Sequence, residues 1–180
     1  MLQDALIQHC APTLAGIKTG NLFSFPFPVS EIIDEIKYIN VSLREKGLRL
    51  IPLRKKRKNT LIYLYRPEKL KEDLSAPEAV DILKKKGYSM RGADCMVAEL
   101  SRHVSCDPEF PHEIGLFLGY PPSDVKCFLK SPCNGVRCAG CWKAYSNEKE
   151  AEEIFKKYKR CTRLYLSEMK KGKTLESLAV

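Results

Sequence analysis

The strongest constraint on the fold lies in residues 30–65, where one helix signature is followed by two strand signatures. Ser30 is a favourable N-cap residue, and Gly47 is typical of the position just after a helix C-terminus. Between them, apolar residues recur at helical spacing, at Ile32, Ile36, Ile39 and Leu43. The spacing predicts a helix over residues 30–46.

The segments that follow predict a β-hairpin. Leu48 and Leu50 lie on one face of the first arm, and residues 60–65 are rich in β-branched and aromatic side chains. Pro67 is expected to end the second arm. The connection between the arms is wholly basic and contains Arg54, Lys55, Lys56, Arg57 and Lys58.

Helical patterns make up most of the remaining chain, and they decide the fold class. We predict a short helix over residues 2–9 that Pro12 ends, a strand over 21–25, a capping box at 75–78 that opens a helix ended by Gly87, helices near 93–105, 111–118 and 122–130, a short strand over 142–145, and a long helix from Asn147 to Gly172. These elements predict a single α+β domain over residues 1–180. Its small, mainly antiparallel sheet is covered by five or more helices.

Composition narrows the class of protein further. The 180 residues, 44% of them apolar, suffice for one packed domain. The start of the chain lacks a basic n-region, and no window holds the roughly 18 to 20 consecutive apolar residues of a membrane helix. We therefore expect a cytoplasmic protein with reduced thiols, no membrane association and no cofactor.

The basic run at residues 54–58 is the first candidate site. The net charge of +9 is concentrated in residues 48–66, which carry seven basic and no acidic residues, and in residues 119–180. Five cations on a hairpin tip could bind an anionic ligand or an acidic protein partner. The alternative is a solvated turn that adds little to stability and protects an edge strand from aggregation.

Residues 110–130 resemble a helix-turn-helix, with Ile114, Leu118, Val125 and Phe128 at its buried positions and Gly119 in its turn. Residues 109–130 carry a net charge of −1, and Asp124 lies where DNA phosphates would approach a recognition helix. We therefore expect two packed helices and do not expect nucleic acid as a partner. DNA binding stays an alternative.

The cysteines form a second candidate site. Cys133, Cys138 and Cys141 have spacings that could converge on a metal ion, with Cys161 or Cys127 as the fourth ligand. A single C-x-x-C is a weak signal, so we expect no metal there. A Cys-based metal module stays an alternative.

The third candidate is a small-molecule or catalytic site built from residues 9–23 and 110–125. Its candidate ligand-site residues are Cys10, Lys18, Asn21, His112 and Glu113. Neighbours such as His9 and Cys10 cannot point the same way in regular structure, so His112 is the better base for Cys10. The alternative interpretation is that Cys10 is a buried apolar residue and His112 a first-turn helix residue.

Two long motifs resemble a known family. They are HCAPTLAGIK running on to NLF at residues 9–23, and FPHEIGLFLGYP running on to Asp124-Val125 at residues 110–125, with CWKAY downstream at 141–145. With these motifs the chain resembles a bacterial family known as domain of unknown function 3793, over essentially its whole length. The resemblance implies a single bacterial cytoplasmic domain and no particular activity.

The function favoured by these observations is a binding or accessory module that engages an anionic ligand or an acidic partner. Whether the protein is an enzyme stays open. The polar residues of the two motifs separate the alternatives, because a small-molecule site requires them to line one cleft.

Overall fold

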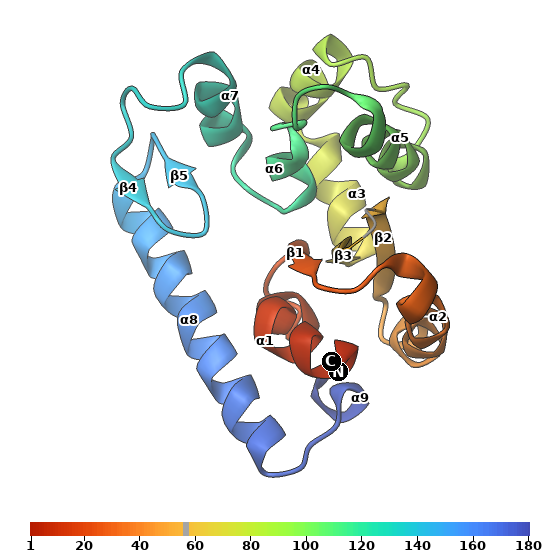
Figure 1. The fold of residues 1–180 in the computed structure, drawn as a ribbon. Helices are drawn as coiled ribbons and strands as arrows, with labels where there is room; N and C mark the ends of the chain where they lie inside the picture. Colours follow the sequence, from red (N-terminus) through yellow and green to blue (C-terminus); the bar gives the residue numbers. More distant parts are fainter. Residues whose placement is uncertain (56–57) are drawn as a thin grey trace.

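The computed structural model describes residues 1–55 and 58–180 (Figure 1). Along the chain the elements are α1 (Leu2–Leu14), β1 (Gly20–Phe25), α2 (Val29–Glu45), β2 (Arg49–Lys55), β3 (Thr60–Tyr65), α3 (Pro67–Ser75), α4 (Pro77–Lys85), α5 (Ala93–Cys106), α6 (Ile114–Phe117), α7 (Pro122–Lys130), β4 (Cys138–Ala139), β5 (Lys143–Ala144), α8 (Glu148–Lys170) and α9 (Leu175–Leu178). Within the basic run, Lys56 and Arg57 and the side chains of Arg54 and Lys55 lie outside the described residues, whereas Lys58 is exposed.

The main sheet is antiparallel, with the strand order β1-β3-β2, and it confirms the predicted α+β fold and hairpin. The central strand β3 is buried on both faces. Because side chains alternate along a strand, Ile62 and Leu64 enter one core while Tyr63 and Tyr65 enter the other. A β-bulge between Pro52 and Arg54 interrupts the register of the β2–β3 pair.

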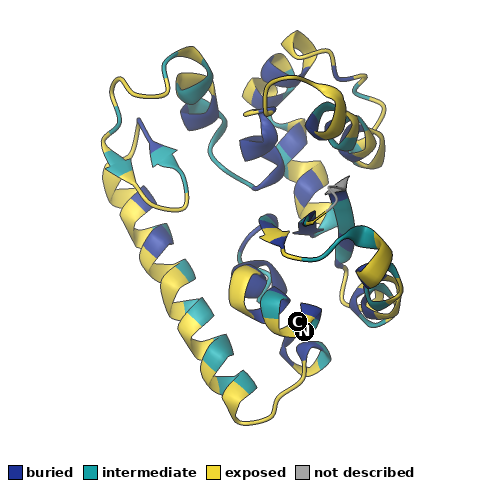
Figure 2. Cartoon of the chain, viewed as in Figure 1, coloured by how far each residue is buried: buried dark blue, intermediate teal, exposed yellow. Residues whose placement is uncertain are grey.

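The two large cores lie on opposite faces of this sheet. The first joins the sheet to α1, α2 and α9, and the second joins it to α3, α4, α5, α6 and α7. The long helix α8 runs along α1 at the edge of the molecule (Figure 1). Figure 2 shows its dark, buried positions mainly near its N-terminal end, where Ala151 and Phe155 pack against the small β4–β5 hairpin.

The N-terminal helix differs from its prediction, because α1 continues through Pro12 to Leu14. Proline removes one helical hydrogen bond, but the carbonyl that loses it belongs to Gln8, an exposed residue. The helix ends instead in a Schellman motif, in which Gly16 N donates to Thr13 O and Ile17 N donates to Pro12 O. Gly16 has the positive φ of 71° that this motif requires.

The structure differs from the sequence analysis in two ways near residue 75. Helix α3 was not predicted, and the predicted capping box is wrong because Ser75 is the last residue of α3. Its hydroxyl donates to the carbonyl of Lys71, and α4 has no side-chain cap.

The cap of α8 is confirmed. The side chain of Asn147 accepts from the backbone N of Glu150 and donates to its carboxylate.

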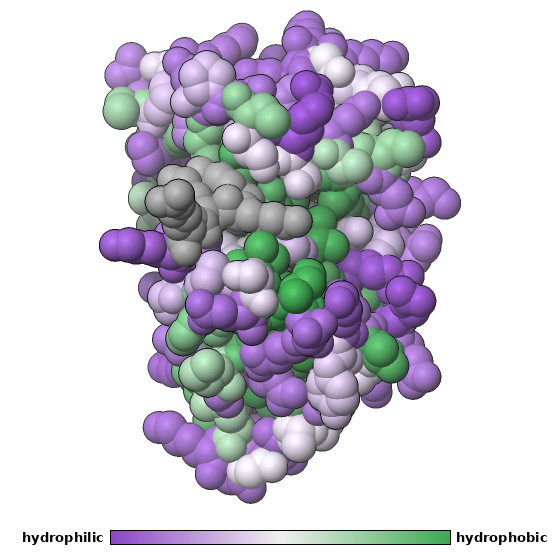
Figure 3. All heavy atoms as spheres, turned by 45° about the vertical axis from the view of Figure 1, so that its right-hand side comes forward, coloured by the Kyte–Doolittle hydropathy of each residue, from purple (hydrophilic) through white to green (hydrophobic). Residues whose placement is uncertain are grey.

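One face of the molecule, shown in Figure 3, is mostly polar. On the face shown in Figure 3, hydrophilic residues cover most of the area and hydrophobic atoms gather in a central band. In the part of the chain that the structure describes, no helix has the length and apolar character needed to cross a membrane.

Candidate functional site

A cavity of about 570 Å³ lies between α8 and the α1–β1 segment, and we call it the Lys18 pocket. Its size falls within the range of small-molecule sites. Its lining residues are His9, Pro12, Lys18, Asn21, Cys141, Tyr158, Lys159, Thr162 and Arg163. Lys18 and Asn21 are candidate ligand-site residues of the sequence analysis, and the structure joins them to four residues of α8 that were not among its candidate site residues.

The Schellman motif at the end of α1 places Lys18 in this pocket. The reversed chain brings the backbone N of Lys18 to the carbonyl of Pro12, at 3.1 Å. The side chain is 6% exposed, and its ammonium lies 5.3 Å from the ring centroid of Tyr120 and 5.8 Å from that of Tyr158. Both distances are those of cation–π contacts, which hold the ammonium at a fixed place in the wall.

Among the described residues, the charge of Lys18 has no carboxylate partner. None of the ion pairs formed by the described residues includes Lys18, Lys159 or Arg163. Burial lowers the pKa of Lys18 from 10.5 to about 8, and the nearby thiols of Cys141 and Cys10 oppose that shift. The described residues that line the pocket include no aspartate or glutamate, so the other formal charges there are also positive.

We expect Lys18→Met to stabilise the folded protein at pH 7. The gap between pKa values of 10.5 and about 8 corresponds to about 3 kcal/mol of unfavourable charge burial. Between these values the unfolded wild type binds more protons than the folded form. Its stability therefore rises with pH, and the advantage of the variant should vanish above about pH 10.5. Urea unfolding of both proteins from pH 7 to 11 measures this, and a variant that is less stable at pH 7 would contradict it.

The N-terminal residues of the pocket have defined partners. His9 stacks on Phe23 with ring centroids 4.9 Å apart, and the side-chain oxygen of Asn21 accepts from the hydroxyl of Thr13 at 2.7 Å. The amide nitrogen of Asn21 is therefore the atom that can donate to a ligand. Cys10 points the other way, into the first core, and burial strongly raises its pKa.

Cys141 reaches the pocket from the tip of the β4–β5 hairpin. A Cβ on Gly140 would lie 2.4 Å from the ring of Phe155, so only glycine lets this tip pack so closely on α8. The next residue, Trp142, packs edge-on against Phe155 and stacks on Tyr120.

Asp124 holds the same hairpin from the other side. This buried carboxylate accepts hydrogen bonds from Trp142 Nε1 (2.8 Å), Tyr145 N (2.9 Å), Ser146 N (3.2 Å) and the Ser146 hydroxyl (3.0 Å). In the helix-turn-helix hypothesis Asp124 would face DNA. In the structure it is 3% exposed and binds the protein's own backbone.

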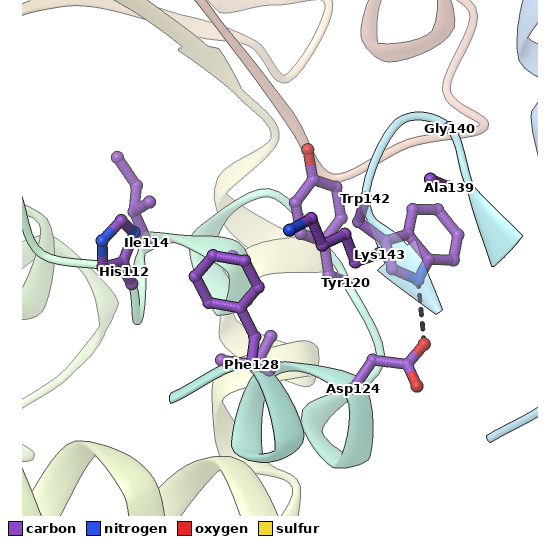
Figure 4. A pocket seen from close by; sticks show the side chains of 11 residues that line it. His112, Ile114, Tyr120, Asp124, Phe128, Ala139, Gly140, Trp142 and Lys143 are labelled. Carbon is purple, nitrogen blue, oxygen red and sulfur yellow. Dashed lines mark hydrogen bonds between the residues drawn. The ribbon is translucent and has the colours of Figure 1, made fainter. Parts of the chain in front are cut away.

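A second cavity, the Trp142 cleft, has a volume of about 350 Å³ and lies between α6, α7 and the hairpin. Figure 4 shows His112, Phe128, Tyr120, Lys143 and Trp142 around it, with the indole bonded to Asp124. Lys143 already donates to the carbonyl of Pro132.

The burial predicted for the helix-turn-helix segment holds at three of four positions. Phe128 is half-buried in this cleft, against our expectation that the core would cover it, whereas Ile114, Leu118 and Val125 are buried as predicted.

The structure brings the two sequence motifs together but divides their candidate residues. Thr19 donates to Asp73 beside Gly119, whose φ is positive at 75°, and Lys18 lies over Tyr120. His112 lines the Trp142 cleft, away from Cys10. Glu113 is buried, where it accepts from the hydroxyl of Tyr88 and lies 3.9 Å from Lys86.

The candidate metal-ligand cysteines differ in exposure. Cys133 and Cys141 are exposed, whereas Cys138 and Cys161 are half-buried. Among residues 1–55 and 58–180, no three His, Cys, Asp or Glu side chains form a group that could hold a metal ion.

Comparison with known proteins gives one match. A family model described as "Protein of unknown function (DUF3793)" matches residues 6–179. No curated protein and no solved structure matches the chain.

Proposed function

Since the chain belongs to the DUF3793 family, whose description names no function, we propose from the geometry of its own site that it binds a small anionic ligand in the Lys18 pocket. One observation carries this proposal. The ammonium of Lys18 is buried without a carboxylate partner among the described residues, in a cavity whose other charges are also positive.

The energetics of a buried charge favour an anionic occupant. An unpaired buried charge is strongly unfavourable, and proteins normally pair it or neutralise it. The described residues that line the Lys18 pocket supply no negative charge, so a bound anion would provide the partner that the ammonium of Lys18 lacks. Binding would also return the pKa of Lys18 toward its ordinary value.

The lining residues define the chemistry of that ligand. The guanidinium of Arg163 can donate two parallel hydrogen bonds to a carboxylate or a phosphate, and Lys18 adds a point charge. Asn21 adds a neutral donor, while Pro12 and Tyr158 offer apolar surface. This combination fits a small molecule that carries two or more negative charges as phosphate or carboxylate groups.

Calorimetric titration with pyrophosphate and with citrate tests the proposal. Each charged hydrogen bond contributes about 1.5–3 kcal/mol, so Lys18→Met and Arg163→Ala should each weaken binding about 10- to 100-fold. Lys149→Ala is the matched control, because it removes one exposed cation of α8 that does not line the pocket. Citrate is almost fully ionised by pH 8, so its affinity should fall as the pH rises past about 8, where Lys18 loses its proton.

Two results would contradict the proposal. One is the failure of both pyrophosphate and citrate to bind at low salt. The other is an equal loss of affinity in Lys149→Ala, which would show that the net charge of the protein, rather than the pocket, attracts the anion.

The structure gives the other functional hypotheses less support. Binding of an acidic partner by the basic run stays a prediction, because most of that run lies outside the described residues. An enzyme built from Cys10 and His112 loses support, since Cys10 is buried in the first core and His112 lines the other cavity.

A further inference from the structure

Cys141 is an exposed thiol in the same cavity as the buried ammonium of Lys18, which pairs with no carboxylate among the described residues. We infer that Cys141 is the nucleophile of the Lys18 pocket, and that it attacks an anionic electrophile held there by Lys18 and Arg163. This inference rests on the proposed function and adds to it a covalent step and a substrate class.

The position of the sulfur supports this role. Cys141 lies at the tip of a hairpin that is fixed on two sides, by Gly140 against Phe155 and by Trp142 bonded to Asp124. A nucleophile on such a support keeps its place relative to a bound ligand. Holding two reacting groups together in this way can replace a very high concentration of free reactant.

The other thiols lack this combination of access and neighbouring charge. Cys10 is fully buried, and burial of the partly covered Cys161 raises its pKa. Cys95, Cys106, Cys127 and Cys133 are exposed, but none of them lines the Lys18 pocket. Among the described residues of the pocket wall, Cys141 alone carries a thiol.

The substrate class follows from the charges beside the sulfur. It is a small molecule in which a carboxylate or phosphate lies next to an electrophilic carbon that bears a leaving group. The thiol releases its proton to solvent, the sulfur forms a bond to that carbon, and the leaving group departs with the bonding electron pair. Lys18 and Arg163 keep the anionic group in place and change no bond.

Paired alkylating agents provide the test, because iodoacetate is an anion and iodoacetamide is its neutral analogue. Both form a sulfur–carbon bond and release iodide. The full chain is alkylated and then digested, and mass spectrometry of the peptides gives the alkylation rate at each cysteine. We expect the iodoacetate-to-iodoacetamide rate ratio to be about tenfold or more higher at Cys141 than at Cys95, which serves as the internal reference.

Variants of the pocket and competition by pyrophosphate show which groups raise the iodoacetate-to-iodoacetamide rate ratio at Cys141. Lys18→Met and Arg163→Ala should bring the ratio at Cys141 close to that at Cys95, whereas Lys149→Ala should leave it unchanged. Pyrophosphate should protect Cys141 from iodoacetate and leave Cys95 reactive. The difference between the two cysteines should disappear in urea, where the pocket is lost.

The outcomes separate this inference from the proposed function. If pyrophosphate binds and depends on Lys18, but Cys141 shows the same ratio as Cys95, the pocket binds anions and the nucleophile assignment is wrong. If pyrophosphate and citrate do not bind and the ratios are also equal, both the proposed function and this inference fail.

Discussion

Arg66→Ala is expected to lower the free energy of unfolding by about 5 kcal/mol, and the melting temperature by about 10–20 °C. The guanidinium of Arg66 donates to four main-chain oxygen atoms from three parts of the chain. They belong to Thr13 (2.8 Å) and Leu14 (2.9 Å) at the end of α1, to Lys46 after α2 (3.2 Å), and to Val180 (2.5 Å). Without it, carbonyls at the ends of two helices lose their partner.

Thermal and urea unfolding, followed by circular dichroism, measure this loss. Arg66→Lys should recover little of it, because a single ammonium cannot reach acceptors that a planar guanidinium spans. Arg91→Ala is the control, since it removes an equal charge from an exposed position. A loss below about 1 kcal/mol in Arg66→Ala would show that the junction is held by packing alone.

Asp124→Ala is expected to cost about 4 kcal/mol, because it leaves four donors without their shared acceptor. The effect should be local as well as global. The chain has one tryptophan, Trp142, and its indole would lose both its hydrogen bond and its fixed contact with Tyr120. We therefore expect the fluorescence of the folded variant to shift to longer wavelength.

Asp34→Ala is the control for this experiment, because it removes an acidic residue that is exposed on α2. It should change neither the melting temperature nor the emission of Trp142 by a measurable amount. An Asp124→Ala protein with the wild-type emission spectrum would show that the hairpin keeps its position without the carboxylate.

The elements that were predicted correctly are those whose sequence pattern lies within the element itself. The helix over 30–46 and the hairpin after it depend on apolar spacing and on Gly47, and the structure places α2, β2 and β3 there. The signal for α3 was also local, but Pro67 was interpreted only as a strand terminator. A proline can equally open a helix, and Leu70 and Leu74, one turn apart, both face the second core.

The candidate site was harder to predict, because its residues meet through packing between distant elements. Lys18 and Asn21 could be named from one motif, but nothing in that motif indicates which helix covers it. On α8, Ala151, Phe155 and Tyr158 recur at helical spacing, a pattern typical of a face that packs on the protein. The cations Lys159 and Arg163, four residues apart beside that face, were the signal that the pattern left unused.

His112 and Glu113 illustrate a second limit. Adjacent residues point in different directions, so a pair that looks like one chemical unit in sequence divides between two environments. Here the imidazole borders the Trp142 cleft while the carboxylate bonds to Tyr88 in the second core. The same geometry at His9 and Cys10 was anticipated, and the structure separates those two side chains between the Lys18 pocket and the first core.

The position of α9 has a consequence for how the protein folds during synthesis. Leu175, Leu178 and Ala179 complete the first core beside α1, roughly 160 residues after that helix has been made. At a synthesis rate of about 5–20 residues per second, the apolar face of α1 is made about ten to thirty seconds before the α9 residues that pack beside it. Contacts so far apart in the chain also close slowly, because a long loop must be ordered before they form. The second core is built from residues within 22–129, so its residues are all made before α9, and it can pack before the first core is complete.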